Sequence, residues 1–146
     1  MRRLTSNGCA SVYAAGDIAR WPNALYGEEM RVEHWTNASE QGALAAQNAM
    51  AEQRGDELLT YAPVPFFWSD QYDRRIQFLG RAAPGDAVEV VAGSVEDRTF
   101  VALYSQGDRL RAVLGMNQPK AVMSLRKLLE ARGSLAEARA LLAPKV

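Results

Sequence analysis

Residues 98–116 read Arg-Thr-Phe-Val-Ala-Leu-Tyr-Ser-Gln-Gly-Asp-Arg-Leu-Arg-Ala-Val-Leu-Gly-Met. Two largely apolar runs flank a short polar segment, Gln-Gly-Asp, at residues 106–108. Glycine and aspartate are the residues that tight hairpin turns favour, so this stretch predicts two paired strands. The pairing must be antiparallel, because parallel strands would need a long crossover between them.

Two more strands are predicted on the amino-terminal side of this hairpin. Residues 75–79 alternate as a half-buried strand does, with Ile76 and Phe78 on one face. A turn sequence, Pro-Gly-Asp at residues 84–86, then leads into a strand over residues 87–92. Because all the connections are short, the pattern indicates an antiparallel sheet.

Two helices are predicted to follow the sheet. Pro119 suits the first turn of a helix. Ser134 and Glu137 have the spacing of a capping box, which would start a last helix that ends near Pro144. Residues 62–146 are therefore predicted to form a small α+β domain, an antiparallel sheet with two carboxyl-terminal helices. The apolar positions of the first helix are Ala121, Val122, Leu125, Leu128 and Leu129.

The first sixty residues show a different pattern. The apolar run at residues 12–15, Val-Tyr-Ala-Ala, predicts a buried strand that ends at Gly16 and Asp17. In open α/β sheets, ligands bind at the carboxyl ends of the strands. Asp17 is therefore a candidate ligand contact. Residues 20–34 are predicted to be a loop, because proline, asparagine and glycine recur in them.

A helix is predicted from about Asn37 to a polar exit at residues 53–57. Thr36 or Asn37 would cap it, and Glu40 would lie in its first turn, where the helix dipole favours negative charge. Small residues recur along one side at spacings of three and four, which indicates close packing against another backbone. These small residues are Ala38, Gly42, Ala45 and Ala49.

The composition excludes several classes of protein. The chain has 146 residues with 17 basic and 17 acidic side chains, whereas nucleic-acid-binding domains are usually clearly basic. No apolar run approaches the roughly 20 residues of a membrane-spanning helix, and the start lacks the apolar segment of a secretory signal. The single cysteine, Cys9, permits no internal disulfide and fits a reducing compartment. We expect a cytoplasmic protein that binds neither nucleic acid nor membrane.

Three segments taken together resemble one protein family. They are residues 12–19 (Val-Tyr-Ala-Ala-Gly-Asp-Ile-Ala), 31–38 (Arg-Val-Glu-His-Trp-Thr-Asn-Ala) and 65–73 (Pro-Phe-Phe-Trp-Ser-Asp-Gln-Tyr-Asp). Their order and spacing resemble the carboxyl-terminal third of FAD-dependent NAD(P)H:ferredoxin reductases of the putidaredoxin reductase and biphenyl dioxygenase types. Such reductases serve Rieske dioxygenases and cytochromes P450. Apoptosis-inducing factor is a more distant relative, and residues 4–6, Leu-Thr-Ser, resemble the segment that commonly precedes the first motif.

The resemblance implies that residues 1–58 finish an FAD-binding domain and that residues 62–146 form the third domain of a reductase. No Gly-x-Gly-x-x-Gly sequence occurs in the chain, so the family's cradles for the FAD and NAD(P)H pyrophosphates are absent. We therefore expect a fragment of a larger flavoprotein, with FAD as its cofactor and NAD(P)H as co-substrate at a missing domain. The fragment alone is expected to be inactive.

The resemblance also implies the cofactor contacts. Asp17 would accept a hydrogen bond from the flavin, and the helix that starts near Asn37, just after Trp35, would point its positive end at the anionic part of a reduced flavin. No catalytic side chain is expected, because electron transfer is the cofactor's own chemistry. No metal site is expected either, because His34 has no further ligands at metal-binding spacing. The predicted cofactor-binding residues are Gly16, Asp17, Glu33, His34, Trp35 and Trp68.

The implied electron acceptor is a 2Fe-2S ferredoxin. Trp68, in a loop between domains, would present an apolar face to it, and Arg74 and Arg75 are further predicted partner contacts. Two alternatives remain. The chain could be a non-catalytic interaction or dimerisation domain that forms a homodimer. It could also be part of a reductase for another acceptor, such as rubredoxin or a quinone.

Overall fold

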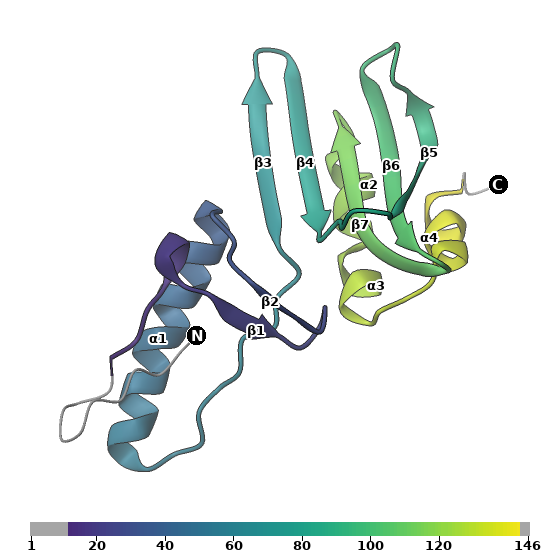
Figure 1. The fold of residues 1–146 in the computed structure, drawn as a ribbon. Helices are drawn as coiled ribbons and strands as arrows, with labels where there is room; N and C mark the ends of the chain where they lie inside the picture. The colour runs from purple at the N-terminus through teal and green to yellow at the C-terminus, as the bar shows by residue number, and fades with distance from the viewer. Residues whose placement is uncertain (1–11, 144–146) are drawn as a thin grey trace. The chain divides into compact units, whose positions relative to one another are not determined.

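A computed structural model describes residues 12–143 and divides the chain into two compact units, Met1–Pro63 and Val64–Val146 (Figure 1). Residues 4–6 and Cys9, about which the sequence raised expectations, lie outside the described residues. Within the described part, no helix is both long and apolar enough to span a bilayer. The assignment of each unit to a reductase domain remains a prediction.

The unit Val64–Val146 is built on one antiparallel sheet with the strand order β3-β4-β7-β6-β5. The predicted hairpin is confirmed: β6 and β7 pair from Phe100 opposite Met116 to Gln106 opposite Arg109, and Gly107 in the turn has φ 59°. The predicted α+β class is confirmed as well. The strands are β3 (Phe66–Gln71), β4 (Arg74–Gly80), β5 (Ala87–Ser94), β6 (Thr99–Gln106) and β7 (Arg109–Met116).

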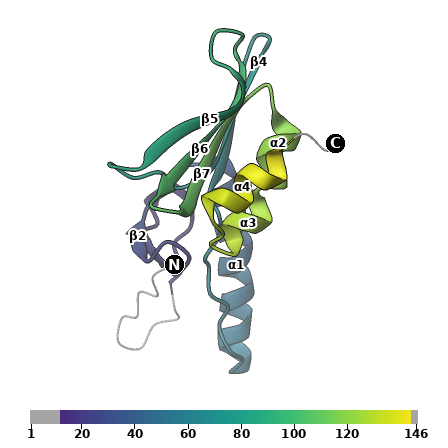
Figure 2. The same ribbon diagram turned by 90° about the vertical axis from the view of Figure 1, so that its right-hand side faces the viewer.

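Three short helices follow, and Figure 2 shows them on one face of the sheet. They are α2 (Pro119–Ser124), α3 (Arg126–Glu130) and α4 (Leu135–Leu142). The single helix predicted after Pro119 is wrong, because the chain breaks it at Leu125, whose N–H bonds to the Val122 carbonyl at 3.2 Å. This tighter turn eclipses side chains three residues apart, so Val122 and Leu125 can both be fully buried. The capping box of α4 is confirmed, with Ser134 and Glu137 each accepting from the other's backbone N–H.

The core of this unit lies between the sheet and these helices. Leu79, Val113 and Leu103 are register partners across β4, β7 and β6, and all three are fully buried. Gly115 marks the closest approach, since a Cβ atom there would lie 2.3 Å from a methyl group of Val122. The lack of a side chain at Gly115 therefore lets α2 rest directly on β7.

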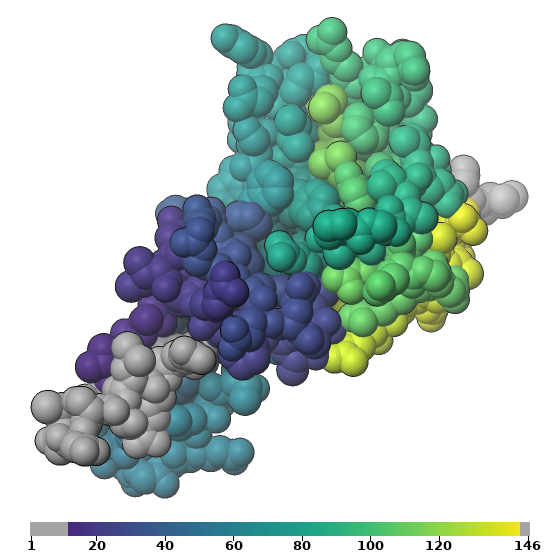
Figure 3. All heavy atoms as spheres, viewed as in Figure 1, coloured from purple at the N-terminus to yellow at the C-terminus, as the bar shows by residue number. Residues whose placement is uncertain are grey.

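The opposite face of the sheet carries no helix in the described part of this unit. In Figure 3 the side of this unit turned to the viewer shows its strands and the connection between β4 and β5, coloured teal to green, and the yellow last helix shows only along the rim. The rings of Phe67, Phe78 and Tyr104 form a row across this face: Phe67 stacks on Phe78 with centroids 5.7 Å apart, and Tyr104 meets Phe78 edge to face at 5.5 Å. Val88, the cross-strand partner of Tyr104, and Val90 are exposed beside them. This face is therefore apolar and open.

The unit Met1–Pro63 contains η1 (Gly16–Ile18), β1 (Trp21–Asn23), β2 (Glu28–Met30) and α1 (Trp35–Arg54). The strand predicted at residues 12–15 does not form: Val12 makes an isolated bridge, and the next three residues belong to no strand. A buried strand of a parallel sheet pairs with neighbours on both sides. The described residues provide no such neighbours.

The loop predicted over residues 20–34 is also wrong, because part of it forms the antiparallel β1–β2 hairpin. Trp21 pairs with Met30, and both side chains are buried. Asn23 Oδ1 accepts the N–H of Leu25 at 3.0 Å, which is an Asx turn. Asparagine and glycine, which favour loops in general, belong here to a hairpin turn.

The helix α1 starts at Trp35, earlier than predicted, and its predicted cap is wrong. His34 is the N-cap residue without a side-chain cap bond, and the first turn contains no acidic residue. Asn37 instead lies inside the helix and is buried. The predicted polar exit is confirmed, because Gly55 ends the helix in the left-handed conformation, with φ 75°.

The buried side of α1 is made largely of carboxamides. Asn37, Gln41 and Asn48 are all buried. Asn37 Nδ2 donates to the Val32 carbonyl at 2.9 Å. Asn48 forms two bonds with Leu59, donating to its carbonyl at 2.9 Å and accepting from its N–H at 2.8 Å. The irregular segments beside α1 have backbone groups that need partners, and a carboxamide offers both a donor and an acceptor.

We expect Asn48→Ala to lower the free energy of unfolding by about 1–3 kcal/mol, because it leaves two backbone groups of Leu59 without their partner. Urea unfolding of the 146-residue chain, followed by circular dichroism, measures the change. Gln47→Ala, at an exposed position of the same helix, is the matched control and should change stability by less than about 0.5 kcal/mol. Equal losses in both variants would contradict the role of the Asn48–Leu59 pair.

Candidate functional site

The turn η1 packs against the beginning of α1 (Figure 1). Gly16 is buried with φ 77°, and a Cβ atom there would lie 3.3 Å from Ala38 Cβ. The Gly16 N–H donates to Gln41 Oε1 at 2.8 Å. The next two residues, Asp17 and Ile18, are exposed. The turn is thus fixed to the helix by its glycine and presents its following side chains to solvent.

The turn η1 lies near the start of α1, because Gly16 packs against Ala38, the fourth residue of the helix. Trp35, the first helical residue, is 75% exposed. The N-cap residue His34 makes no side-chain cap bond, and the positive end of the helix dipole lies at this end of α1. His34 is half-buried, and the exposed Glu33 forms an ion pair with Arg31. The structure therefore brings Gly16, Asp17 and Trp35 to one end of α1.

This end of α1 offers three kinds of group to a ligand. They are a carboxylate at Asp17, the positive end of the helix dipole, and exposed apolar side chains at Ile18 and Trp35. A flavin has groups that match each kind: hydroxyls on its ribityl chain, anionic ring atoms in the reduced state, and a planar apolar ring. The residues therefore fit a flavin. Among the described residues no cluster of histidine, cysteine or carboxylate side chains could hold a metal ion.

Trp68 lies in the other unit and belongs to strand β3, opposite Gln77 of β4. The prediction that it lies in a loop is wrong, because residues 66–71 pair continuously with β4 and the chain turns only at Tyr72, which has φ 55°. Trp68 is 44% exposed, and its ring stacks on that of Phe66 with centroids 5.8 Å apart. Phe67 points to the opposite face of the sheet, where it stacks on Phe78.

A cationic group completes this aromatic pair. The guanidinium carbon of Arg126, at the start of α3, lies 5.7 Å from the centre of the Phe66 ring. Stacking of arginine on an aromatic face keeps its charge available at the surface. We call Phe66, Trp68 and Arg126 the β3 edge cluster.

The predicted partner contacts Arg74 and Arg75 lie at the start of β4 and are paired locally. Arg74 forms an ion pair with Asp73 at 2.7 Å, and Arg75 forms one with Asp70 at 2.8 Å. Each positive charge is therefore balanced within the β3–β4 hairpin. The hairpin therefore presents arginine side chains to a partner protein, but these two ion pairs carry no net positive charge.

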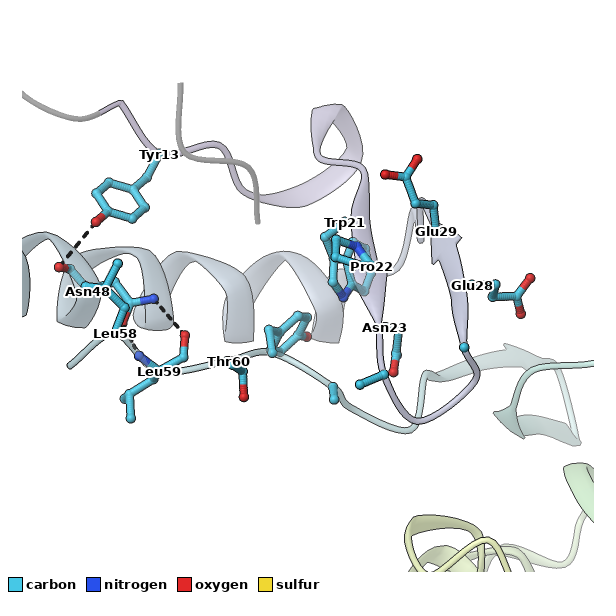
Figure 4. Close-up of a pocket in the computed structure, with 14 residues that line it drawn as sticks. Tyr13, Trp21, Pro22, Asn23, Glu28, Glu29, Asn48, Leu58, Leu59 and Thr60 are labelled. Atoms are coloured by element: carbon cyan, nitrogen blue, oxygen red, sulfur yellow. Dashed lines mark hydrogen bonds between the residues drawn. The ribbon is translucent and has the colours of Figure 1, made fainter. Parts of the chain in front are cut away.

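A cavity of about 560 Å³ lies in the unit Met1–Pro63, between β1, α1 and the segment before Pro63 (Figure 4). The rings of Trp21 and Tyr61, tilted against each other with centroids 5.4 Å apart, form part of its wall. Burial and the carboxylate of Glu40, which accepts a bond from the Tyr61 hydroxyl at 2.9 Å, raise the pKa of Tyr61. None of the predicted site residues lines this cavity.

Two residues of the candidate site, Gln41 and Arg126, are not predicted from the sequence. Gln41 resembles any polar residue of a helix surface, and Arg126 resembles any charged residue of a helix start. The signal for Gln41 was present in its spacing, because Asn37, Gln41 and Asn48 recur as a polar stripe on one side of α1. Arg126 gave no local signal, since its contact with Phe66 joins distant parts of the sequence.

Comparison with known proteins gives consistent matches. Residues 66–145 match the family described as "Reductase C-terminal". The chain is 30% identical over 130 residues to apoptosis-inducing factor 3 of Homo sapiens, covering 88% of this chain and 20% of that protein. It is 32% identical over 137 residues to the ferredoxin–NAD(+) reductase component of the anthranilate 1,2-dioxygenase system of Burkholderia cepacia, covering 93% of this chain and 32% of that protein.

A solved structure agrees with these sequence matches. The covalent complex of putidaredoxin reductase with putidaredoxin contains a chain that superposes with a TM-score of 0.68 at 33% sequence identity. The match covers 81% of this chain and 27% of that one. The present chain therefore spans about a fifth to a third of the length of the proteins that it matches.

We expect Gly16→Ala to destabilise the first unit more than Gly27→Ala does. Both glycines have a positive φ, 77° and 71°, so both substitutions place a side chain in the left-handed region at a cost of roughly 1–2 kcal/mol. Only the Cβ atom at Gly16 would also press on Ala38, whereas that at Gly27 meets open space. Urea unfolding of the two variants compares them directly. Equal destabilisation would contradict close packing of η1 on α1.

Proposed function

We propose that this chain completes a flavoprotein. The premise is that the chain belongs to the Reductase C-terminal family, the carboxyl-terminal domain of ferredoxin–NAD(P) reductases of the putidaredoxin reductase type. This flavoprotein would pass electrons from NAD(P)H through FAD to a 2Fe-2S ferredoxin. Residues 1–58 would finish its FAD-binding domain, and residues 62–146 would form its third domain. The remaining FAD-binding and NAD(P)H-binding parts would come from further polypeptide.

The observation that carries this proposal is the packing of η1 at the start of α1. It places the Asp17 carboxylate and the uncapped helix start at one end of the helix. Asp17 would accept a hydrogen bond from a flavin hydroxyl, and the helix start would favour negative charge on the ring. Trp35 and Ile18 would cover apolar parts of the flavin and keep water away. FAD, when bound, supplies the hydride and single-electron chemistry.

The β3 edge cluster is the surface that we propose for the ferredoxin. Putidaredoxin reductase forms a complex with putidaredoxin, which motivates a ferredoxin as the partner here. Trp68 would offer an exposed aromatic face, and Arg126 would attract an acidic surface. Arg74 and Arg75 could contribute by exchanging Asp73 and Asp70 for acidic groups of the ferredoxin.

We expect the longer polypeptide that contains this chain to bind FAD, and the 146-residue chain alone to remain colourless and inactive with NADH. Asp17→Ala in the longer protein should raise the Kd for FAD roughly 10- to 100-fold, because a hydrogen bond to a charged group is lost. Flavin fluorescence titration of the apoprotein measures this Kd. Glu29→Ala, at an exposed carboxylate of β2, is the matched control and should leave it unchanged. A yellow, active 146-residue chain would refute the proposal.

Arg126→Glu should raise the KM for ferredoxin roughly three- to tenfold while leaving NADH-dependent reduction of ferricyanide unchanged. The charge reversal would repel an acidic partner, so the difference from wild type should shrink at high salt. Arg98→Glu, in the β5–β6 turn, makes the same charge change outside the β3 edge cluster. If R98E and R126E raise KM equally, the effect is one of net charge, and docking at the cluster is contradicted.

A second candidate function is a non-catalytic interaction or dimerisation domain. The match to apoptosis-inducing factor 3 and the open apolar face with Phe67, Phe78 and Tyr104 favour it. The two candidates differ in what the longer polypeptide does. A protein that takes up no FAD and forms a stable dimer through this face would favour the second candidate over the first.

A further inference from the structure

Gln41 is a fully buried amide that contacts the turn carrying Asp17. Its Oε1 accepts the N–H of Gly16 at 2.8 Å, and both residues are buried. Because the Gly16 N–H is excluded from water, it needs this acceptor: a buried donor without a partner is costly. Gln41 therefore satisfies a backbone group at the base of the candidate flavin site.

The orientation of the Gln41 amide follows from this bond. Only its oxygen can accept the Gly16 N–H, so its Nε2 must point the other way. That nitrogen is buried and has no hydrogen-bond partner among the described residues. An apolar side chain of similar size would remove this unsatisfied donor, but it would leave the Gly16 N–H unsatisfied instead. The oxygen of Gln41 is thus the part of the side chain that the turn requires.

Gln41 and Ala38 act on the same turn from neighbouring positions. They are three residues apart, and so lie on one side of α1. Ala38 limits how closely the turn can approach the helix. Gly16 already lies so near that a Cβ atom added to it would be 3.3 Å from Ala38 Cβ. The Gln41 bond draws Gly16 toward the helix. Together they set where the following residue, Asp17, leaves the turn.

We infer that Gln41 is a positioning residue for flavin binding, an inference that rests on the proposed function. It acts through Gly16: its oxygen holds the turn so that the Asp17 carboxylate stands beside the uncapped start of α1. Gln41 itself lies inside the unit, behind the turn, and needs no contact with the flavin. Its loss would misplace Asp17 without removing any group that binds the cofactor.

Two substitutions at Gln41 separate the acceptor from the rest of the side chain. Gln41→Met keeps a similar length and removes the acceptor. Gln41→Glu keeps an oxygen that can accept the Gly16 N–H, whether or not the carboxyl is ionised. Gln47→Met makes the same exchange at an exposed position of α1 and is the matched control. All variants are made in the longer polypeptide and in the 146-residue chain.

In the longer polypeptide we expect Q41M to raise the Kd for FAD by roughly tenfold or more. Q41E should raise it less, and Q47M should leave it unchanged. Because Asp17 moves relative to the flavin, the visible circular dichroism of any flavin that Q41M retains should also change. In the 146-residue chain, the amide of Gly16 should exchange with solvent faster in Q41M than in wild type, as followed by NMR.

Three results would overturn the inference. One is a Q41M protein whose Kd for FAD lies within about threefold of wild type, which is the scatter of a surface change. Another is a Q41E protein that binds FAD as poorly as Q41M, because the oxygen would then be irrelevant. The third is unaltered exchange of the Gly16 amide in Q41M. If wild type itself takes up no FAD, the proposed function fails first and the inference falls with it, so the two failures are distinguishable.

Discussion

The candidate site depends on the carboxamide side of α1. Asn37, Gln41 and Asn48 are buried where most helices bury apolar side chains, and they bond to backbone groups of the segments before and after the helix. Those segments include the turn at Gly16 and the extended chain at Leu59, which have few regular backbone partners of their own. The helix therefore serves as a scaffold that holds irregular chain in place. One of these amides, Gln41, bonds to the turn that carries Asp17 and so ties it to α1.

The sheet could be predicted from the sequence because its signals are local. Alternation over residues 75–79 and the Gly107 turn are visible within a few residues. That turn sets the first two pairs of β6 and β7, and a bulge between Tyr104 and Ser105 shifts the register beyond them. The strand at residues 12–15 was predicted wrongly because a buried strand exists only beside its neighbours, and the described residues supply none. The helix break at Leu125 was not predicted either, because it results from the packing of two helices on the sheet and not from helix propensity.

The site was predictable in part. Asp17 and Trp35 are predicted through a family resemblance, and the structure places both toward the amino-terminal end of α1. Gln41 and Arg126 were missed because burial of a polar residue and stacking of an arginine on Phe66 are properties of the fold. Trp68, predicted to lie in a loop between domains, lies instead in the edge strand β3, which pairs with β4 and leaves the side chain partly exposed.

The two units each contribute exposed aromatic and charged groups, and the proposed function requires that these groups meet at one flavin. A crystal structure of the longer polypeptide with FAD bound tests this requirement most directly. We predict that the Asp17 carboxylate, the first turn of α1 and the indole of Trp68 all lie around the same isoalloxazine ring. A structure in which Trp68 faces away from the flavin, or in which Asp17 makes no contact with it, would contradict this assignment.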